Sequence, residues 1–131
     1  MATILFVDDD EMERVFAGEL LEPRGHELLF AGDGEAALEI FAAEKVDVVV
    51  TDLAMPRLNG LRLIRRLREL DGHVPVIAAS GVAADQLLLA EDLGAVAILQ
   101  KPWDPAAFLE VLHQCLGLHG DAFEGVWPTD S

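Results

Sequence analysis

The sequence has little cysteine, little positive charge and no long hydrophobic run, and each shortage excludes a class of protein. Its single cysteine, Cys115, rules out an internal disulfide bond. No apolar run approaches the roughly 20 residues of a membrane-spanning helix. The N-terminus also lacks the charged and apolar regions of a secretory signal. We therefore expect a soluble, cytoplasmic protein with no membrane partner.

Basic residues are the second shortage. The chain has 9 lysines and arginines against 24 acidic residues, which gives a formal net charge of −15. Nucleic acids and anionic membranes attract basic surfaces, so this balance argues against direct binding to either. Most of the positive charge lies in one segment, which faces either solvent or an acidic partner: Arg57, Arg62, Arg65, Arg66 and Arg68.

What the sequence does contain is an alternation of strand and helix patterns. A chain of 131 residues, 52% of them hydrophobic, is long enough for one domain with a substantial core. Short apolar runs predict strands at 4–7, 27–31, 46–52, 74–79 and 95–99. Apolar residues at helical spacing follow each strand, and the last helix fades after Gly117. The pattern predicts an α/β fold: a doubly wound five-stranded parallel sheet, (βα)5, in three α/β/α layers.

Some residues predict the apolar face of one helix and the ends of two others. The apolar stripe of the first helix is predicted at Met12, Val15, Phe16 and Leu20. Gly94 is predicted to end the fourth helix in the left-handed C′ position. Asp104 followed by Pro105 is typical of a helix start, with an N-cap aspartate and a proline in the first turn.

Asp52 stands at a point where ligands bind in folds of this kind. Three valines, Val48 to Val50, fit a strand covered on both faces, and Asp52 comes where this run ends. Asn59 and Gly60 then indicate a turn. In open α/β sheets the ligand crevice lies outside the carboxyl ends of the strands. Asp52 alone has two explanations, a residue that merely ends the strand or a site residue.

Polar residues at the ends of three other predicted strands favour the site. Asp8 and Asp9 end the first strand, Ser80 ends the fourth and Lys101 ends the fifth. Each has an ordinary explanation as a helix cap, a turn former or a surface charge. The carboxyl ends of parallel strands lie on one edge, however, so with Asp52 these residues are expected to converge on one crevice.

Such a group suits phosphoryl chemistry. Two carboxylates about 4 Å apart repel by roughly 4 kcal/mol at an effective dielectric near 20, and a divalent cation relieves that repulsion. A few carboxylates with water and a phosphoryl oxygen are the ligands that Mg²⁺ prefers. Lys101 and Ser80 provide a positive charge and a hydroxyl donor for a phosphoryl group. Asp52 is then the expected nucleophile, forming an acyl phosphate.

Together these motifs resemble the response-regulator receiver family over residues 3–117. The matching residues are Asp8-Asp9, Asp52 with Met55-Pro56 and Gly60, Ser80, and Lys101-Pro102. The resemblance implies a flavodoxin-like sheet of strand order 2-1-3-4-5 and a cis peptide at Lys101-Pro102. It also implies Asp52 as phosphoacceptor, with Ser80 and Lys101 binding the phosphoryl group. The implied ligands of Mg²⁺ are Asp8, Asp9, Asp52 and the backbone carbonyl of Ala54.

The family's function follows from the same resemblance. A sensor histidine kinase or a histidine phosphotransfer protein would phosphorylate Asp52 in a Mg²⁺-dependent reaction. The domain would assist its own phosphotransfer and dephosphorylation without being an enzyme that turns over external substrates. Residues 1–117 are the expected receiver domain, and residues 118–131 are expected to form a tail without an output domain. Signalling would then pass through a separate effector protein, through phosphate shuttling, or through a longer chain.

One part of the expected switch surface departs from the family. Ile98 occupies a position where the family often has an aromatic residue, which leaves no ring to rotate inward on activation. Leu87, Leu88 and Leu89 are consecutive, and a helix cannot bury three successive residues on one side. We expect Ile98, Leu87 and Leu88 to mark an interface for an effector or a homodimer on the fourth helix, fifth strand and fifth helix. Isolated exposed leucines are the alternative.

Three other functions fit parts of the pattern. An aspartyl phosphatase would place its nucleophile among Asp8, Asp9 and Asp10, and would turn over phosphate esters. A flavin-binding domain of the same topology needs a phosphate loop after the first strand, where this chain has aspartates that would repel the ligand. A scaffold receiver that never takes phosphate is disfavoured by the complete set of acids, serine and lysine.

Overall fold

The computed structural model describes residues 2–55, 59–81, 84–101 and 104–117. Three expectations lie outside the described residues: the motif residue Pro56, the cis peptide before Pro102 and the tail at 118–131. In the part of the chain that is described, no helix combines the length and the apolar character needed to cross a membrane.

Five parallel strands form one sheet in the order β2-β1-β3-β4-β5, as expected. The strands are β1 (Thr3–Val7), β2 (Glu27–Ala31), β3 (Val48–Thr51), β4 (Val76–Ser80) and β5 (Ala97–Gln100). The helices are α1 (Glu11–Leu21), α2 (Gly34–Ala43), α3 (Gly60–Leu70), α4 (Ala84–Leu93) and α5 (Pro105–Gly117), with a short 3₁₀ helix η1 (Glu22–Arg24). The predicted α/β class, its (βα)5 order and its topology are therefore confirmed. The last three strands begin two residues later than predicted.

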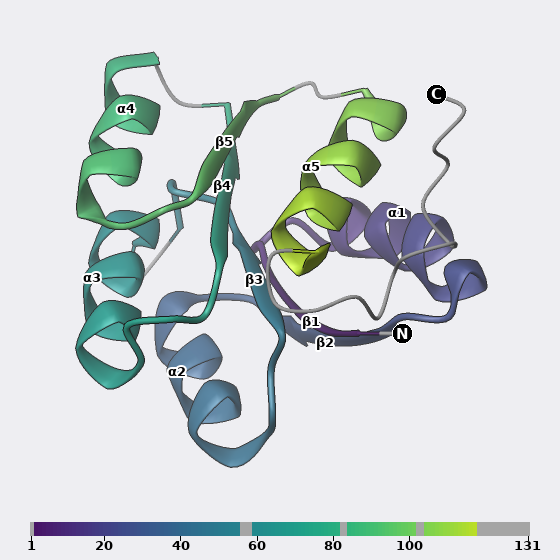
Figure 1. Cartoon of the computed structure of the whole chain (residues 1–131), viewed down its shortest axis with the longest axis horizontal. Coiled ribbons are helices and arrows are strands. Elements are labelled where there is room, and N and C mark those ends of the chain that lie inside the picture. The colour runs from purple at the N-terminus through teal and green to yellow at the C-terminus, as the bar shows by residue number, and fades with distance from the viewer. Residues whose placement is uncertain (1, 56–58, 82–83, 102–103, 118–131) are drawn as a thin grey trace.

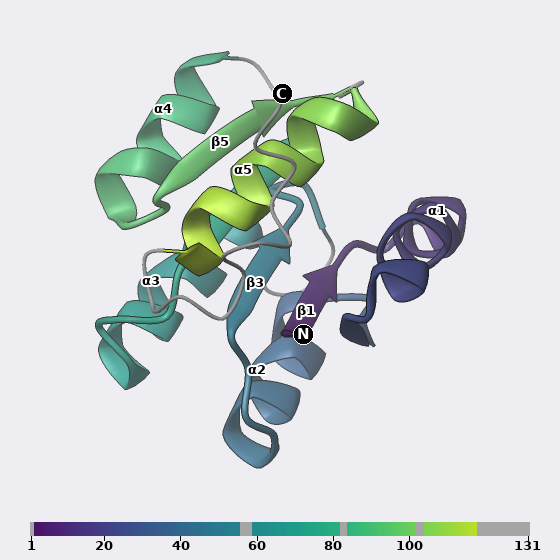
Figure 2. The ribbon, with the colours of Figure 1, turned by 45° about the vertical axis from the view of Figure 1, so that its right-hand side comes forward.

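The helices cover both faces of the sheet. Helices α1 and α5 lie on one face, and α2, α3 and α4 lie on the other (Figures 1 and 2). Strand β3 shows why its valine run is apolar throughout, because Val49 packs in the core on the α2–α4 side while Val48 and Val50 pack on the α1–α5 side. The sheet is thus buried on both faces, as parallel sheets are.

The buried face of α1 differs from the prediction. Met12, Val15 and Phe16 are 73%, 48% and 40% exposed, so the predicted apolar stripe faces largely outward. The buried face instead carries the small residues Ala17 and Gly18 together with Leu21. A Cβ atom at Gly18 would lie 3.8 Å from the ring of Phe30, so the small residues let the helix lie close to β2.

The predicted ends of two helices are confirmed. Gly94 follows α4 with φ +128°, in the region where L side chains are strained. Asp104 caps α5, because its Oδ2 accepts a hydrogen bond from the Ala107 amide at 3.1 Å. Pro105 is the first residue of that helix, as predicted.

One residue of the predicted interface is placed wrongly by the sequence. Leu87 is 3% exposed and packs in the core between α4 and the sheet, whereas Leu88 and Leu89 are 55% and 46% exposed. A helix directs successive residues about 100° apart, so one of three adjacent leucines points inward and two point outward. Ile98 is half-buried and packs against the same core.

Candidate functional site

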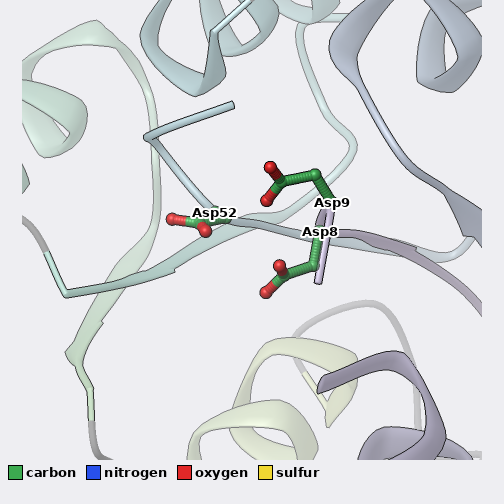
Figure 3. A group of neighbouring side chains, drawn as sticks. All are labelled: Asp8, Asp9 and Asp52. Atoms are coloured by element: carbon green, nitrogen blue, oxygen red, sulfur yellow. The ribbon is translucent and has the colours of Figure 1, made fainter. Parts of the chain in front are cut away.

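The predicted acidic cluster forms at the carboxyl edge of the sheet. Asp8 follows β1 and Asp52 follows β3, and these neighbouring strands pair Val7 with Thr51 directly before the two aspartates. One carboxylate oxygen from each of Asp8, Asp9 and Asp52 lies within 4.8 Å of the others. Figure 3 shows the three carboxylates extending to the same side of the strand ends. Strand order therefore brings together acids that lie far apart in the sequence.

Asp52 is held in place through one of its oxygens. Its Oδ1 accepts hydrogen bonds from the amides of Leu53 at 2.7 Å and Ala54 at 3.2 Å. The Ser80 hydroxyl donates to the same oxygen at 2.5 Å. Ser80 itself is buried at the end of β4, which lies next to β3. The Asp52 side chain is 13% exposed, so solvent reaches it.

Gly60 is required by the backbone that carries Asp52. A Cβ atom at this position would lie 2.1 Å from the carbonyl oxygen of Asp52 and 2.6 Å from the Cα of Leu53. The amide of Gly60 also donates to the carbonyl of Leu53 at 3.0 Å. The first residue of α3 therefore lies directly against the phosphoacceptor candidate, where any side chain would displace the loop.

Lys101 places a positive charge between the acids. Its Nζ lies 2.7 Å from Asp8 Oδ2, 3.6 Å from Glu13 Oε1 and 3.7 Å from Asp52 Oδ2. Burial raises the pKa of Asp8, and its hydrogen bond from Lys101 offsets only part of that rise. For Lys101, burial lowers the pKa, but the hydrogen bond and charge of Asp8, with the charges of Asp52 and Glu13, raise it above its ordinary value.

Two site residues were not among the predictions. Glu13 adds a third carboxylate near Lys101, beside those of Asp8 and Asp52. Arg14 donates from Nη1 to the backbone carbonyl of Asp8 at 2.6 Å. Both lie on the first turns of α1, immediately after the acidic run, and that position is the sequence signal that could have indicated them. Ile98, Leu87 and Leu88 lie on β5 and α4, outside the contacts described for this site.

Comparison with known proteins assigns the family. A family model described as the response regulator receiver domain matches residues 4–113. The chain belongs to this family. It is a receiver domain of two-component signalling systems, which confirms the class of function expected from the sequence. Phosphorylation on an aspartate and Mg²⁺ binding are general features of such domains.

Three similar proteins illustrate the match. The sensory/regulatory protein RpfC of Xanthomonas campestris pv. campestris is 35% identical over 114 residues, which are 83% of this chain and 16% of RpfC. Sporulation initiation phosphotransferase F of Bacillus subtilis is 29% identical over 102 residues, 77% of this chain and 82% of that protein. A crystal structure of a receiver domain protein from Clostridium thermocellum matches with a TM-score of 0.85 and 30% identity, covering 91% of this chain and 97% of the other. The chain thus spans only a small part of the length of RpfC.

The acidic cluster of this receiver domain has the chemistry of a magnesium site. Its donors are carboxylate oxygens, which Mg²⁺ binds in preference to nitrogen or sulfur. The exposed Asp9 and the partly exposed Asp52 leave room for the waters that Mg²⁺ retains. The residues present therefore fit the metal. The role of the Ala54 backbone carbonyl as a metal ligand stays a prediction.

Proposed function

We propose that Asp52 of this receiver domain accepts a phosphoryl group from the phosphohistidine of a sensor kinase or phosphotransfer protein. The observation that carries the proposal is the set of contacts around Asp52. Its carboxylate lies beside two further acids, accepts a hydrogen bond from Ser80 and lies 3.7 Å from Lys101 Nζ. The names of its relatives, a sensory/regulatory protein and a phosphotransferase, agree with such a donor.

The two oxygens of Asp52 have different tasks in this proposal. Oδ1 is held by two backbone amides and Ser80, so it fixes the orientation of the carboxylate. Oδ2 faces Lys101 at 3.7 Å and has lone pairs left to attack phosphorus. The P–N bond of the phosphohistidine breaks as the Oδ2–P bond forms, and the histidine nitrogen keeps the electron pair. Positioning and charge neutralisation supply the catalysis in such transfers.

Asp8, Asp9 and Asp52, with the carbonyl of Ala54, would hold Mg²⁺. When bound, the ion neutralises charge on the acids and the phosphoryl oxygens. Lys101 Nζ, which donates to Asp8 in this structure, would donate to a phosphoryl oxygen. The Ser80 hydroxyl, which donates to Asp52 Oδ1, would turn to a second phosphoryl oxygen. The domain thereby assists its own phosphorylation and dephosphorylation, and it turns over no external substrate.

The proposed output surface lies on α4 and β5. Leu88 and Leu89 are 55% and 46% exposed on α4, and Val96 is 49% exposed just before β5. Ser80 lies at the end of β4 and pairs with Gln100 of β5, so movement of its hydroxyl reaches this surface through one strand. An effector protein or a second copy of the domain would bind there. Ile98 is half-buried on β5, so its part in this switch is its packing against the core.

Phosphorylation with acetyl phosphate tests the assignment. The full chain is incubated with acetyl phosphate and MgCl₂, and the modified peptide is mapped by mass spectrometry. We expect one phosphoryl group on Asp52, none in Asp52→Asn, and normal modification in Asp92→Asn, a matched change on exposed α4. Modification of Asp8, Asp9 or Asp10 with continuing release of phosphate would support the phosphatase alternative. No modification of the folded protein would support a scaffold without phosphate.

A further inference from the structure

Arg14 makes a contact with the acidic loop that the proposed reaction leaves unexplained. It lies on the inward side of α1, near Ala17 and Leu21, and its Nη1 donates to the backbone carbonyl of Asp8 at 2.6 Å. A Cβ atom at Gly32 would lie 3.6 Å from the same nitrogen, so the guanidinium also lies beside the loop between β2 and α2. Arg14 therefore joins α1 to the ends of two strands.

The contact completes a set of bonds around Asp8. The Asp8 amide donates to the carbonyl of Ala31 at 3.0 Å. Its Oδ1 accepts from the Asp10 amide at 2.9 Å, and its Oδ2 accepts from Lys101 at 2.7 Å. The carbonyl bond from Arg14 fixes the remaining polar group, and hence the plane of the peptide that joins Asp8 to Asp9. A bond from a charged donor is roughly twice as strong as a neutral one.

The orientation of that peptide matters most for Asp9. Among the described residues, none forms a hydrogen bond or ion pair with the Asp9 carboxylate, and the residue is exposed. Its direction toward Asp8 and Asp52, visible in Figure 3, is therefore set by its backbone. By holding the carbonyl of Asp8, Arg14 thus orients Asp9, a proposed metal ligand, without contacting the ion.

We infer that Arg14 is a positioning residue for the cation site, acting through the Asp8 carbonyl to orient Asp9. The inference rests on the proposed role of the acidic cluster as a Mg²⁺ site. Partners that orient metal ligands typically change metal affinity by 10–100-fold when they are lost. The charge of Arg14 acts in the opposite direction, because a nearby cation repels Mg²⁺. The change in Mg²⁺ affinity when Arg14 is lost therefore distinguishes the two effects. Weaker binding indicates orientation, and tighter binding indicates charge repulsion.

The test is the Mg²⁺ dissociation constant of the full chain, measured by isothermal titration calorimetry. We expect Arg14→Met to weaken Mg²⁺ binding about 10-fold, and Arg14→Lys, which keeps a donor and a charge, to restore most of it. Shifted Asp9 and Asp10 amide resonances in metal-free Arg14→Met would report the same loss of orientation. If Arg14→Met does not fold, Arg14→Gln provides the milder truncation, and thermal melts without metal establish which variants are folded.

Arg24→Met is the matched control. Arg24 Nη1 also donates to a backbone carbonyl, that of Leu20, at 2.6 Å, but at the opposite end of α1. We expect this variant to bind Mg²⁺ as the wild type does. Unchanged or tighter binding in Arg14→Met would overturn the positioning role while leaving the proposed function intact. A wild-type chain that binds no Mg²⁺ would overturn both.

Discussion

Lys101 Nζ lies 2.7 Å from Asp8 Oδ2 but 3.7 Å from Asp52 Oδ2, so the lysine hydrogen-bonds to Asp8 and makes only a longer ion pair with the proposed phosphoacceptor. Asp8 is 1% exposed and would be a costly buried charge without this partner. The lysine ammonium thus neutralises part of the charge of Asp8, as a bound metal ion would. If Asp8 holds Mg²⁺ as proposed, the ion would compete with Lys101 for this carboxylate, and the lysine would become available to a phosphoryl group.

This competition predicts the behaviour of Lys101→Met. The variant leaves Asp8 without its ion-pair partner, so we expect about 2 kcal/mol lower unfolding free energy without metal. It should also bind Mg²⁺ more tightly than the wild type, because the competing charge is gone. Urea unfolding with and without MgCl₂ measures both effects. Equal destabilisation in the two conditions would contradict competition for Asp8.

Gly60 offers a test of the loop that carries Asp52. In Gly60→Ala the new Cβ overlaps the carbonyl of Asp52, so the loop must move. We expect a loss of about 1–3 kcal/mol in unfolding free energy and slower phosphorylation of Asp52 by acetyl phosphate.

Gly72→Ala is the control for this substitution. A Cβ atom at Gly72 would meet nothing within 4 Å, so its stability should change by no more than about 0.5 kcal/mol. Normal stability and phosphorylation rate in Gly60→Ala would show that the close approach is not needed.

The sheet and the position of the acids could be predicted from the sequence because both depend on local patterns. Apolar runs that end in a polar residue define parallel strands, and the topology of such sheets brings their carboxyl ends together. Asp8, Asp52, Ser80 and Lys101 therefore meet as predicted. This prediction used only the points where the apolar runs end in polar residues, and it needed no detail of side-chain packing.

The faces of the helices could not be predicted with the same certainty. Met12 and Phe16 fit the period of an apolar stripe, yet Ala17 and Gly18 lie inward, where their small size lets α1 lie close to β2. The contact from Arg14 to a backbone carbonyl leaves no signature in composition or charge. Such features depend on the distance between packed elements, which a single sequence does not encode locally.

The leucines of α4 give a direct test of one such face. Leu87 is 3% exposed and Leu88 is 55% exposed, although they are adjacent and chemically identical. We expect Leu87→Ala to lower the unfolding free energy by about 2–5 kcal/mol because it leaves a cavity. Leu88→Ala should change it by about 0.5 kcal/mol or less. Chemical denaturation of both variants measures the difference, and equal losses would place the buried face of α4 elsewhere.

The stability of the protein in acid is expected to depend on a pair of histidines far from the acidic cluster. His26, just before β2, and His113 of α5 are both buried, with ring centroids 5.8 Å apart. Burial, followed by the charges of His113 and Arg24, lowers the pKa of His26 from 6.5 to about 4. Burial also lowers the pKa of His113. Protonation of either ring would thus oppose the packing of α5 against the start of β2.

The sign follows from the protons bound in each state. Above pH 6.5 His26 is neutral in both states and its contribution to stability is complete. Between pH 6.5 and about 4 the unfolded chain binds a proton that the native protein does not, so stability falls as the pH falls. The slope from this group is at most about 1.4 kcal/mol per pH unit, and the full loss is about 3 kcal/mol.

Unfolding free energies measured across this pH range in wild type and His26→Gln isolate the contribution, because the titration of the carboxylates is common to both proteins. We expect the difference between the two curves to shrink as the pH falls from 6.5 toward 4. A constant difference between wild type and His26→Gln would mean that His26 takes up its proton in the native protein as readily as in the unfolded chain, and that the contact between α5 and β2 tolerates the charge.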